Sequence, residues 1–352
     1  FLIKLFQMFG IEAFKMISGI FFILKKKKKK KILYLIRDIV GVKPLYYKEK
    51  NGNIFFSTLI NPLLIEDKSS LNLHAANYYN NFGYSDLNET FYQGIFKLLP
   101  GELLIYKNKS ISKKKFLNFN FKRKFSDTLI KEKLESIIKK QTVSDVPISI
   151  SLSGGIDSNI LLSNIDKNLN SYTVSYSYKD NQSIDSIFAA RRAKQFNISH
   201  NEIRVSDDDF FGSLEKIIDL LEEPVGNENV VGNYFLSKNI REKVLFVGDG
   251  GDEIFTGYNK YRSIYFFSLI NKINFLKFIK PNFTNKNFQR FFLNNKEMHL
   301  SFSNQNLIGN NNAYKFFNRI NANQVCYNHY IDSSFEEPNL QKVMLADIDT
   351  WV

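Results

Sequence analysis

The sequence has little of what marks secreted and membrane proteins. Among its 352 residues there is one cysteine, Cys326, so an intrachain disulfide framework is excluded. The first 24 residues are apolar, but their longest stretch without a charge, residues 16–24, is far shorter than the roughly 20 residues of a membrane-spanning helix. A lysine run follows at residues 25–31, in place of the small residues at which a signal peptide is cleaved. These absences favour the cytoplasm.

The charge balance is basic, and much of the excess has a local origin. A net charge of +13 would by itself suggest a nucleic-acid-binding protein. Residues 25–31 supply seven of these charges, which leaves a modest remainder of six. The run lies between two apolar segments, 21–24 and 32–35, that look like the strands of a hairpin, so we interpret it as a solvated turn. The alternative is a patch for a polyanion or a membrane surface. We expect neither nucleic acid nor membrane as a partner.

A glycine pair stands between a predicted strand and a predicted helix. Residues 151–158 read Ser-Leu-Ser-Gly-Gly-Ile-Asp-Ser, after an alternating apolar run at 146–150 and before an apolar helix start at 160–162. The first turn of a helix has free backbone N–H groups and partial positive charge, so a turn in this place can bind an anion. No lysine follows the glycines, which excludes a P-loop. The pattern instead resembles the pyrophosphate loop of the ATP pyrophosphatases, which cut ATP between its α- and β-phosphates.

The residues of this loop have expected roles. Gly154 and Gly155 let the backbone approach the anion, and Ser153 and Ser158 add hydroxyl donors. The alternative is an ordinary Gly-Gly turn in which Asp157 or Ser158 caps the helix.

A second glycine-rich turn carries three carboxylates. Residues 243–253 read Lys-Val-Leu-Phe-Val-Gly-Asp-Gly-Gly-Asp-Glu, so Asp249, Asp252 and Glu253 follow a short apolar strand. Crowded like charges need a cation or a polar ligand, and hard oxygen ligands suit Mg²⁺. The alternative for Asp252 and Glu253 is a solvated helix start. Both turns follow strands, and ligands of doubly wound sheets bind beyond the carboxyl ends of the strands. We therefore predict a magnesium nucleotide site.

The order of predicted elements is that of an α/β protein of about two domains. In residues 1–116 strands and turns dominate, with one helix-like stretch at 2–17 and a hairpin turn at 51–53. Residues 113–126 are expected to be a linker and 281–313 a loop-rich insertion. Beyond the linker, strands alternate with helices, which predicts a doubly wound parallel sheet. The expected strands there are 146–152, 172–176, 203–205 and 243–247, and the expected helices are 127–140, 158–165, 187–196, 210–221 and 266–279.

Five segments, in order along the chain, resemble the glutamine-hydrolysing asparagine synthetases of the asparagine synthetase B type. Arg-Asp-Ile-Val-Gly-Val-Lys-Pro-Leu-Tyr-Tyr at 37–47 is similar to a signature of that family's glutaminase domain. Gly-Asp-Gly-Gly-Asp-Glu-Ile-Phe-Thr-Gly-Tyr at 248–258 is similar to its second synthetase motif. The other segments are Leu-Leu-Pro-Gly at 98–101, Ser-Asp-Val-Pro at 144–147 and Glu-Glu-Pro at 222–224. A transfer-RNA-modifying relative with a similar Ser-Gly-Gly loop would lack the segment 37–47.

The resemblance implies two domains and a reaction. Residues 1–116 would be the later part of a type 2 glutamine amidotransferase domain of the N-terminal-nucleophile fold, which is α+β. Residues 117–352 would be a PP-loop ATP pyrophosphatase domain, similar to the adenine nucleotide α-hydrolases. The enzyme would be an asparagine synthase-type ligase that consumes aspartate, ATP with Mg²⁺, and glutamine or ammonia. A β-aspartyl-AMP intermediate would form with release of pyrophosphate, and ammonia would then displace AMP. A homodimer is left open.

The resemblance also implies roles for single residues. Asp157 and Asp252 would hold Mg²⁺, and Asp38 in the other domain would hold the amino group of glutamine. The expected catalytic acids are Asp249, which would lie beside the adenylate, Asp252 and Glu253. The expected residues of the ATP and pyrophosphate site are Leu152, Ser153, Gly154, Gly155, Asp157, Ser158, Val174, Val247 and Gly248. Leu152, Val174 and Val247 would at the same time be strand core.

Both ends depart from the family pattern. The chain begins with Phe1, whereas the family carries its nucleophilic cysteine at the mature N-terminus. Residues 343–347 look like the approach to a catalytic lysine that would follow further on. We therefore expect an internal fragment of a longer enzyme, with little turnover of its own. Cys326 is expected to be a small packed hydrophobe rather than a nucleophile.

Departures from the family pattern at two single residues and in two short stretches leave the acceptor of the amide open. Val247 stands where serine is usual, and Thr58 where glutamate is usual. Residues 226–229 and 232–233 also differ from the common pattern. One alternative is a related adenylating enzyme that acts on another carboxylate, such as a β-lactam-forming cyclising synthetase or an amidotransferase for surface polysaccharide. Another is an inactive protein that keeps only the fold.

Overall fold

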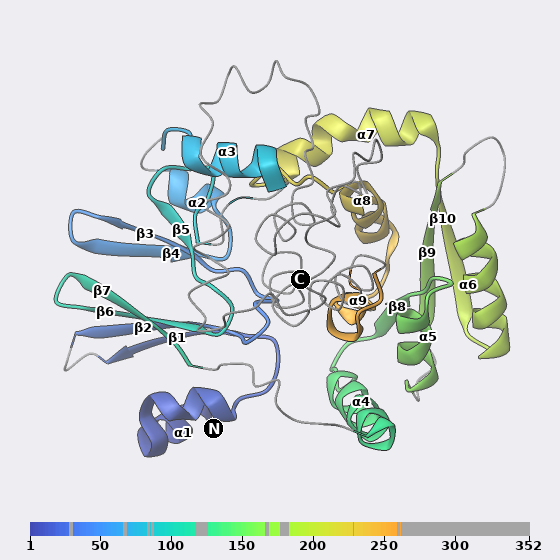
Figure 1. Cartoon of the computed structure of the whole chain (residues 1–352), viewed down its shortest axis with the longest axis horizontal. Coiled ribbons are helices and arrows are strands. Elements are labelled where there is room, and N and C mark those ends of the chain that lie inside the picture. The colour runs from blue at the N-terminus through green and yellow to red at the C-terminus, as the bar shows by residue number, and fades with distance from the viewer. Residues whose placement is uncertain are drawn as a thin grey trace, which may run out of the picture. The chain divides into compact units, whose positions relative to one another are not determined.

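Figure 1 shows the computed structural model of the chain, which describes residues 1–27, 31–65, 69–82, 85, 88–116, 126–165, 169–176, 183–227, 229–258 and 261. The predictions for Cys326 and for residues 266–279, 281–313 and 343–347 lie outside these ranges. The chain divides into two compact units, one with Phe1–Phe121 and the chain from Asp252 onward, the other with Lys122–Gly251.

The first unit contains two antiparallel sheets that pack face to face. Side chains alternate between the two faces of a strand, so Leu35 and Leu104 of one sheet meet Tyr47 of the other, and Leu45 just before it, in a shared core. One sheet has the order β1-β2-β6-β7, with β1 Phe22–Lys27, β2 Ile32–Arg37, β6 Glu102–Lys107 and β7 Ser110–Lys115. The other has the order β4-β3-β5, with β3 Tyr46–Lys50, β4 Asn53–Ser57 and β5 Ile95–Lys97.

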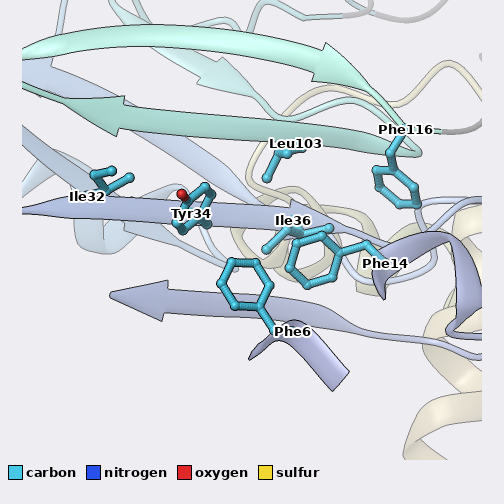
Figure 2. Close-up of a cluster of buried hydrophobic side chains, with 7 residues drawn as sticks. All are labelled: Phe6, Phe14, Ile32, Tyr34, Ile36, Leu103 and Phe116. Atoms are coloured by element: carbon cyan, nitrogen blue, oxygen red, sulfur yellow. The ribbon is translucent and has the colours of Figure 1, made fainter. Parts of the chain in front are cut away.

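Helices cover the outer faces of these sheets. The predicted helix at 2–17 is instead an α-helix, α1 (Leu2–Phe9), and a 3₁₀-helix, η1 (Gly10–Met16). The break falls at Gly10, whose φ of 60° no residue adopts inside an α-helix. Figure 2 shows Phe6 and Phe14 of these helices against Tyr34 and Ile36 of β2. On the second sheet, α2 (Asn61–Leu64) packs through Leu63, and α3 is Leu73–Phe82.

Two lysine-rich segments prove to be strands. Residues 25–27 end β1, where Lys25 pairs with Tyr34, so the predicted hairpin is confirmed but these three lysines belong to its strand rather than to its turn, in which Lys31 lies with a φ of 48°. Residues 113–115 end β7 and are not the linker that we expected. Both strands are at an edge of the sheet, where lysine is tolerated because it discourages pairing with another chain. The predicted hairpin turn is present, with positive φ at Asn51 (53°) and Gly52 (67°), as a type I′ turn requires.

The second unit is built on a parallel sheet. Its strands are β8 (Ile148–Ser151), β9 (Asn170–Tyr176), β10 (Ser199–Val205) and β11 (Val244–Phe246), in the order β10-β9-β8-β11 with every pairing parallel. The chain runs outward from β8 to β10 and then returns to the far side of β8 as β11. The strand order thus reverses between β8 and β11, and the Ser149 hydroxyl donates a hydrogen bond to the carbonyl of Val244 there, at 3.1 Å. This is the doubly wound topology that the sequence predicts.

Helices lie on both faces of this sheet. Leu162 of α5 and Ala189 of α6 pack on one face with Ile150 of β8, and α8 lies on the other (Figure 1). α8 was not predicted, because Gly232 and several asparagines leave its sequence with little helical periodicity. The helices are α4 (Asp127–Gln141), α5 (Ile156–Ser163), α6 (Ile184–Gln195), α7 (Asp207–Leu220) and α8 (Asn229–Asn239), and α9 (Gly251–Phe255) follows β11. None of the helices in the described ranges is long and apolar enough to cross a membrane.

Candidate active site

The glycine pair at residues 154–155 forms a loop that is held from within. Gly155 is the N-cap of α5 and offers no side chain, so Asp157 and Ser158 do not cap this helix. The Ser158 hydroxyl is buried and lies 3.1 Å from that of Ser153, which accepts a hydrogen bond from the Gly155 N–H at 3.1 Å. Both hydroxyls therefore shape the loop here. The glycines themselves are exposed at the start of α5.

The second turn lies directly against this loop. A Cβ placed on Gly248 would be 3.0 Å from the backbone nitrogen of Ser158 and 3.0 Å from the Cβ of Asp157. A Cβ on Gly251 would collide with the carboxylate of Asp157. Neither position has space for a side chain, because β8 and β11 are neighbours and their loops leave the same edge of the sheet. The glycine loop at residues 151–158, the predicted pyrophosphate loop, and the glycine-rich turn therefore meet at the point where the strand order reverses.

The three acidic residues of the turn differ in their surroundings. Asp249 is exposed and Asp252, the residue after Gly251, is half-buried. Glu253 is only 6% exposed, and its Oε1 accepts a hydrogen bond from the Tyr258 hydroxyl at 2.8 Å. A carboxylate held in this way has less freedom to reach a substrate than Asp249 or Asp252. Their catalytic roles stay predictions.

The residues expected to line an adenosine pocket fall into two groups. Leu152 is buried between β8 and helices α5 and α6, which makes it core, as the sequence also suggests. Val247 is 44% exposed at the end of β11. Val174 is half-buried on the β9 face toward α8, where its Cγ1 lies 4.0 Å from the position of a Cβ on Gly232. Of the three, Val247 and Val174 are thus open enough to touch a ligand in this state.

Sequence reasoning missed residues that brace the pyrophosphate loop. A Cβ on Gly154 would lie 3.0 Å from Oδ1 of Asp185 and 3.2 Å from Cβ of Phe188, so the first turn of α6 lies against the loop. The predicted helix began at 187 and omitted this turn, although Ser183, which accepts the N–H of Ser186 at 3.1 Å, is a recognisable N-cap. Asn159 also braces the loop, since its amide donates to the Gly155 carbonyl at 2.6 Å.

In the first unit, Asp38 is 1% exposed and surrounded by amides. Its Oδ1 accepts hydrogen bonds from the N–H groups of Gly41 at 2.7 Å and Val42 at 3.1 Å, and its Oδ2 accepts one from Lys43 at 3.1 Å. The neighbouring Arg37 donates to the carbonyls of Lys43 and Leu98, at 2.9 and 2.7 Å. These bonds organise the turn after β2. A contact of Asp38 with glutamine stays a prediction.

The carboxylates suit a cation that arrives with phosphate. No group of three or more His, Cys, Asp or Glu that could hold a metal by itself occurs in the part of the chain that the structure describes. Mg²⁺ usually binds through one or two carboxylates plus substrate phosphates, so it needs no such group. The carboxylate of Asp157 lies against Gly251, next in the chain to Asp252, and its role as a magnesium ligand stays a prediction.

Comparison with known proteins gives two family matches and several relatives. The asparagine synthase family matches residues 129–352, and the glutamine amidotransferase domain family matches residues 1–117. Asparagine synthetase [glutamine-hydrolyzing] 1 of Bacillus subtilis is 28% identical over 263 residues, which are 71% of this chain and 41% of that protein. A putative asparagine synthetase [glutamine-hydrolyzing] 2 of Methanocaldococcus jannaschii is 26% identical over 292 residues, 77% of this chain and 56% of that protein.

A third relative has a different name. Amidase chyE of Penicillium rubens is 23% identical over 294 residues, which are 74% of this chain and 43% of that protein. The chain thus spans about half the length of the curated relatives it matches. The asparagine synthase match covers more than half of the chain and includes both loops of the site. The chain therefore belongs to the asparagine synthase family.

Proposed function

We propose that the chain carries the ATP-dependent step of glutamine-dependent amide formation, with aspartate as the acceptor. The observation that carries the proposal is the close packing of Gly248 and Gly251 against Asp157 and Ser158. It brings a loop with helix N–H groups and a turn with carboxylates to one edge of the sheet. ATP would bind there with its pyrophosphate at Gly154 and Gly155, and its adenosine near Val174 and Val247.

The reaction that suits this site has two steps. An oxygen of the aspartate side chain attacks the α-phosphorus of ATP, and the bond to the bridging oxygen of the β-phosphate breaks, so pyrophosphate leaves. The nitrogen of ammonia then attacks the activated carbonyl carbon, the bond to the AMP oxygen breaks, and the nitrogen loses a proton. A carboxylate is already a nucleophile, so the first step needs no general base. Its difficulty is the approach of an anion to a polyanion.

The residues of the two loops address that difficulty. The N–H groups and dipole of α5 favour the negative charge that develops on the departing pyrophosphate. Mg²⁺, held by Asp157 and Asp252 together with the phosphates, would supply further neutralising charge. Asp249 is exposed and follows Gly248. We propose that its carboxylate lies beside the adenylate.

Ammonia would come from glutamine in the domain that precedes this one. The match of residues 1–117 to the glutamine amidotransferase domain supports this source, and Asp38 is the residue that we propose for the amino group of glutamine. The cytoplasm, where ATP and both amino acids are available, is the proposed location.

The test supplies aspartate, ATP, Mg²⁺ and ammonia to the purified chain, which bypasses glutamine hydrolysis, and measures pyrophosphate and asparagine. Binding of magnesium pyrophosphate is measured in parallel by calorimetry, so that the site is tested even if turnover is slow. Asp157→Asn should abolish both products and weaken binding, because it removes a metal ligand's charge. Asp219→Asn, an exposed acid on α7, is the matched control. Binding of magnesium pyrophosphate by Asp157→Asn as tightly as by the unsubstituted chain would refute the proposal.

A second candidate is an adenylating enzyme that acts on a different carboxylate. The relative named an amidase, and the unusual residues at 226–229 and 232–233, favour it. Gly232 lies on α8 beside the β9 residues at the carboxyl edge of the sheet: a Cβ on it would be 2.9 Å from the Tyr176 hydroxyl. Pyrophosphate release that depends on an acid other than aspartate would select this candidate.

A further inference from the structure

Glu202 of β10 is the centre of a polar cluster between the sheet and α6. One carboxylate oxygen accepts the hydroxyl of Ser186, and the other accepts both Nε and Nη2 of Arg204, each at 3.0 Å. The Ser175 hydroxyl of β9 also bonds to this carboxylate. The side chain of Glu202 is 15% exposed. Hydrogen bonds to a charged, largely buried carboxylate are the strong ones, so the cluster ties Ser186 firmly to the sheet.

Ser186 belongs to the same helical turn that touches the pyrophosphate loop. Its N–H completes the cap with Ser183, and its hydroxyl bonds to Glu202. Asp185 and Phe188, one residue before and two after it, are the side chains that lie against Gly154. Any movement of this turn away from the sheet would open the contact with Gly154.

We propose that Glu202 is a positioning residue for pyrophosphate binding, acting through Ser186 and the first turn of α6 on Gly154. The role rests on the proposed function of the loop. The bond between Glu202 and Ser186 sets the distance of the α6 turn from the sheet. The turn then holds in place the loop whose N–H groups bind the phosphate. Catalytic geometry is sensitive to such supports, because a displacement of about 1 Å can cost a large factor in rate.

The chain contains a matched control for this role. Glu242 is also a carboxylate bonded by two side chains, Asn170 at 2.6 Å and Tyr172 at 3.0 Å. Its partners stand at the start of β9 and it precedes β11, so it lies at the opposite, amino edge of the same sheet. A purely structural contribution should therefore be similar for Glu202 and Glu242. Only a positioning role should distinguish them.

The first experiment measures, without any nucleotide, hydrogen exchange of the Ser153 and Gly155 amides, which donate to the hydroxyls of Ser158 and Ser153. Glu202→Gln and Ser186→Ala should each accelerate this exchange, the former by at least about tenfold, the factor expected for loss of a charge-assisted hydrogen bond. Glu242→Gln should leave the exchange rate of the loop amides within about twofold of wild type, although the variant is less stable. Unchanged loop exchange in Glu202→Gln would overturn the proposal. If that variant does not fold, Ser186→Ala, which removes one hydroxyl, decides in the same way.

The second experiment titrates each protein with magnesium pyrophosphate. We expect Glu202→Gln to weaken binding about tenfold, Ser186→Ala less, and Glu242→Gln hardly at all. Equal weakening in Glu202→Gln and Glu242→Gln would also overturn the positioning role. If wild type does not bind pyrophosphate but loop exchange still rises in Glu202→Gln, the proposed function fails while the support of the loop by Glu202 stands.

Discussion

Gly248 is the residue on which the approach of the two loops depends most. The atoms that a Cβ would meet there are the backbone nitrogen of Ser158 and the Cβ of Asp157, neither of which can swing aside. At Gly251 the obstacle is the carboxylate of Asp157, the mobile end of a side chain. The two glycines therefore differ in what a methyl group would disturb.

Gly248→Ala should destabilise the second unit and damage the site. Overpacking a close contact costs about 1–3 kcal/mol, and relief would move α5 away from β11. Gly212→Ala is the control, because Gly212 lies inside α7 with no atom within 4 Å of the added Cβ. It should stabilise by up to about 1 kcal/mol through helix propensity. Urea unfolding and pyrophosphate titration of both variants check this; equal effects would contradict it.

Because of Glu202, the free energy of unfolding should depend on pH in the acidic range. Burial opposes ionisation, but hydrogen bonds from Ser186, Ser175 and Arg204, with the charge of Arg204, lower the pKa of Glu202 from 4.5 to about 2. A lowered folded-state pKa gives stability that is present above the unfolded value and lost as pH falls toward the folded one. Each pKa unit is worth about 1.4 kcal/mol, so the full contribution is on the order of 3 kcal/mol.

The stability advantage of wild type over Glu202→Gln should therefore be constant above about pH 4.5 and shrink as the pH falls toward about 2. Urea unfolding of the two proteins at matched pH values measures the difference. An advantage that does not change in this window would show that the carboxylate titrates at its ordinary pKa.

Single residues also show how far the sequence could predict the site. The meeting of Asp157 with the second turn was predictable, because both loops follow strands of a doubly wound sheet. The inward turn of the Ser158 hydroxyl and the bond of Tyr258 to Glu253 were not, since they depend on side-chain packing inside each turn. The contacts of Asp185 and Phe188 with Gly154 required knowing that α6 starts at Ile184.

At the scale of elements, predictions held where periodicity was strong and ends were marked. α4 begins at Asp127, where the predicted helix 127–140 begins, with Ser126 as its cap, and all four strands of the parallel sheet were placed. The lysine-rich ends of β1 and β7 were misassigned because a run of one residue type shows no alternation of apolar and polar residues, which is the pattern that would indicate a strand. Helix α8 lacks both a clear period and a marked start.

The cap of α6 offers a prediction at this scale. Ser183→Ala removes the side chain that accepts the Ser186 N–H and should cost about 1 kcal/mol. It should also weaken pyrophosphate binding, because the turn that it frees lies against Gly154. Ser126→Ala removes the equivalent bond to Leu129 in α4 and should cost about as much stability without weakening binding. Thermal unfolding and calorimetric titration separate the two effects, and equal losses of affinity would contradict the prediction.

At the scale of the whole molecule, each unit has hydrophobic clusters made from its own residues. Those around Ile36 and around Leu35 belong to the first unit, and the one around Ile150 to the second. We therefore expect unfolding in two steps rather than one. The proposed pyrophosphate loop lies in the second unit alone.

Magnesium pyrophosphate should accordingly raise the temperature of the second unit's calorimetric step most, because the loop and Asp157 belong to that unit and only Asp252, the other proposed magnesium ligand, belongs to the first. A ligand at about 100 times its dissociation constant stabilises the folded form by about 2.7 kcal/mol. Asp157→Asn should abolish this shift and leave the other step unchanged, whereas Asp38→Asn should alter only that other step. A ligand-induced shift confined to the first unit's step would contradict the assignment.

The hydrogen bond from Ser149 to Val244 joins β8 to β11, and the two residues are 95 positions apart in the chain. During synthesis the glycine loop after β8 therefore leaves the ribosome long before the strand that completes its surroundings. The contacts of this region join distant parts of the chain, so its contact order is high. Folding must therefore close a long loop, at a cost in conformational entropy, before these contacts can stabilise the fold. A nascent chain interrupted before Val244 would hold the glycine loop without the turn that packs against it, so any affinity of the proposed site for a nucleotide should appear only after Val244 has been made.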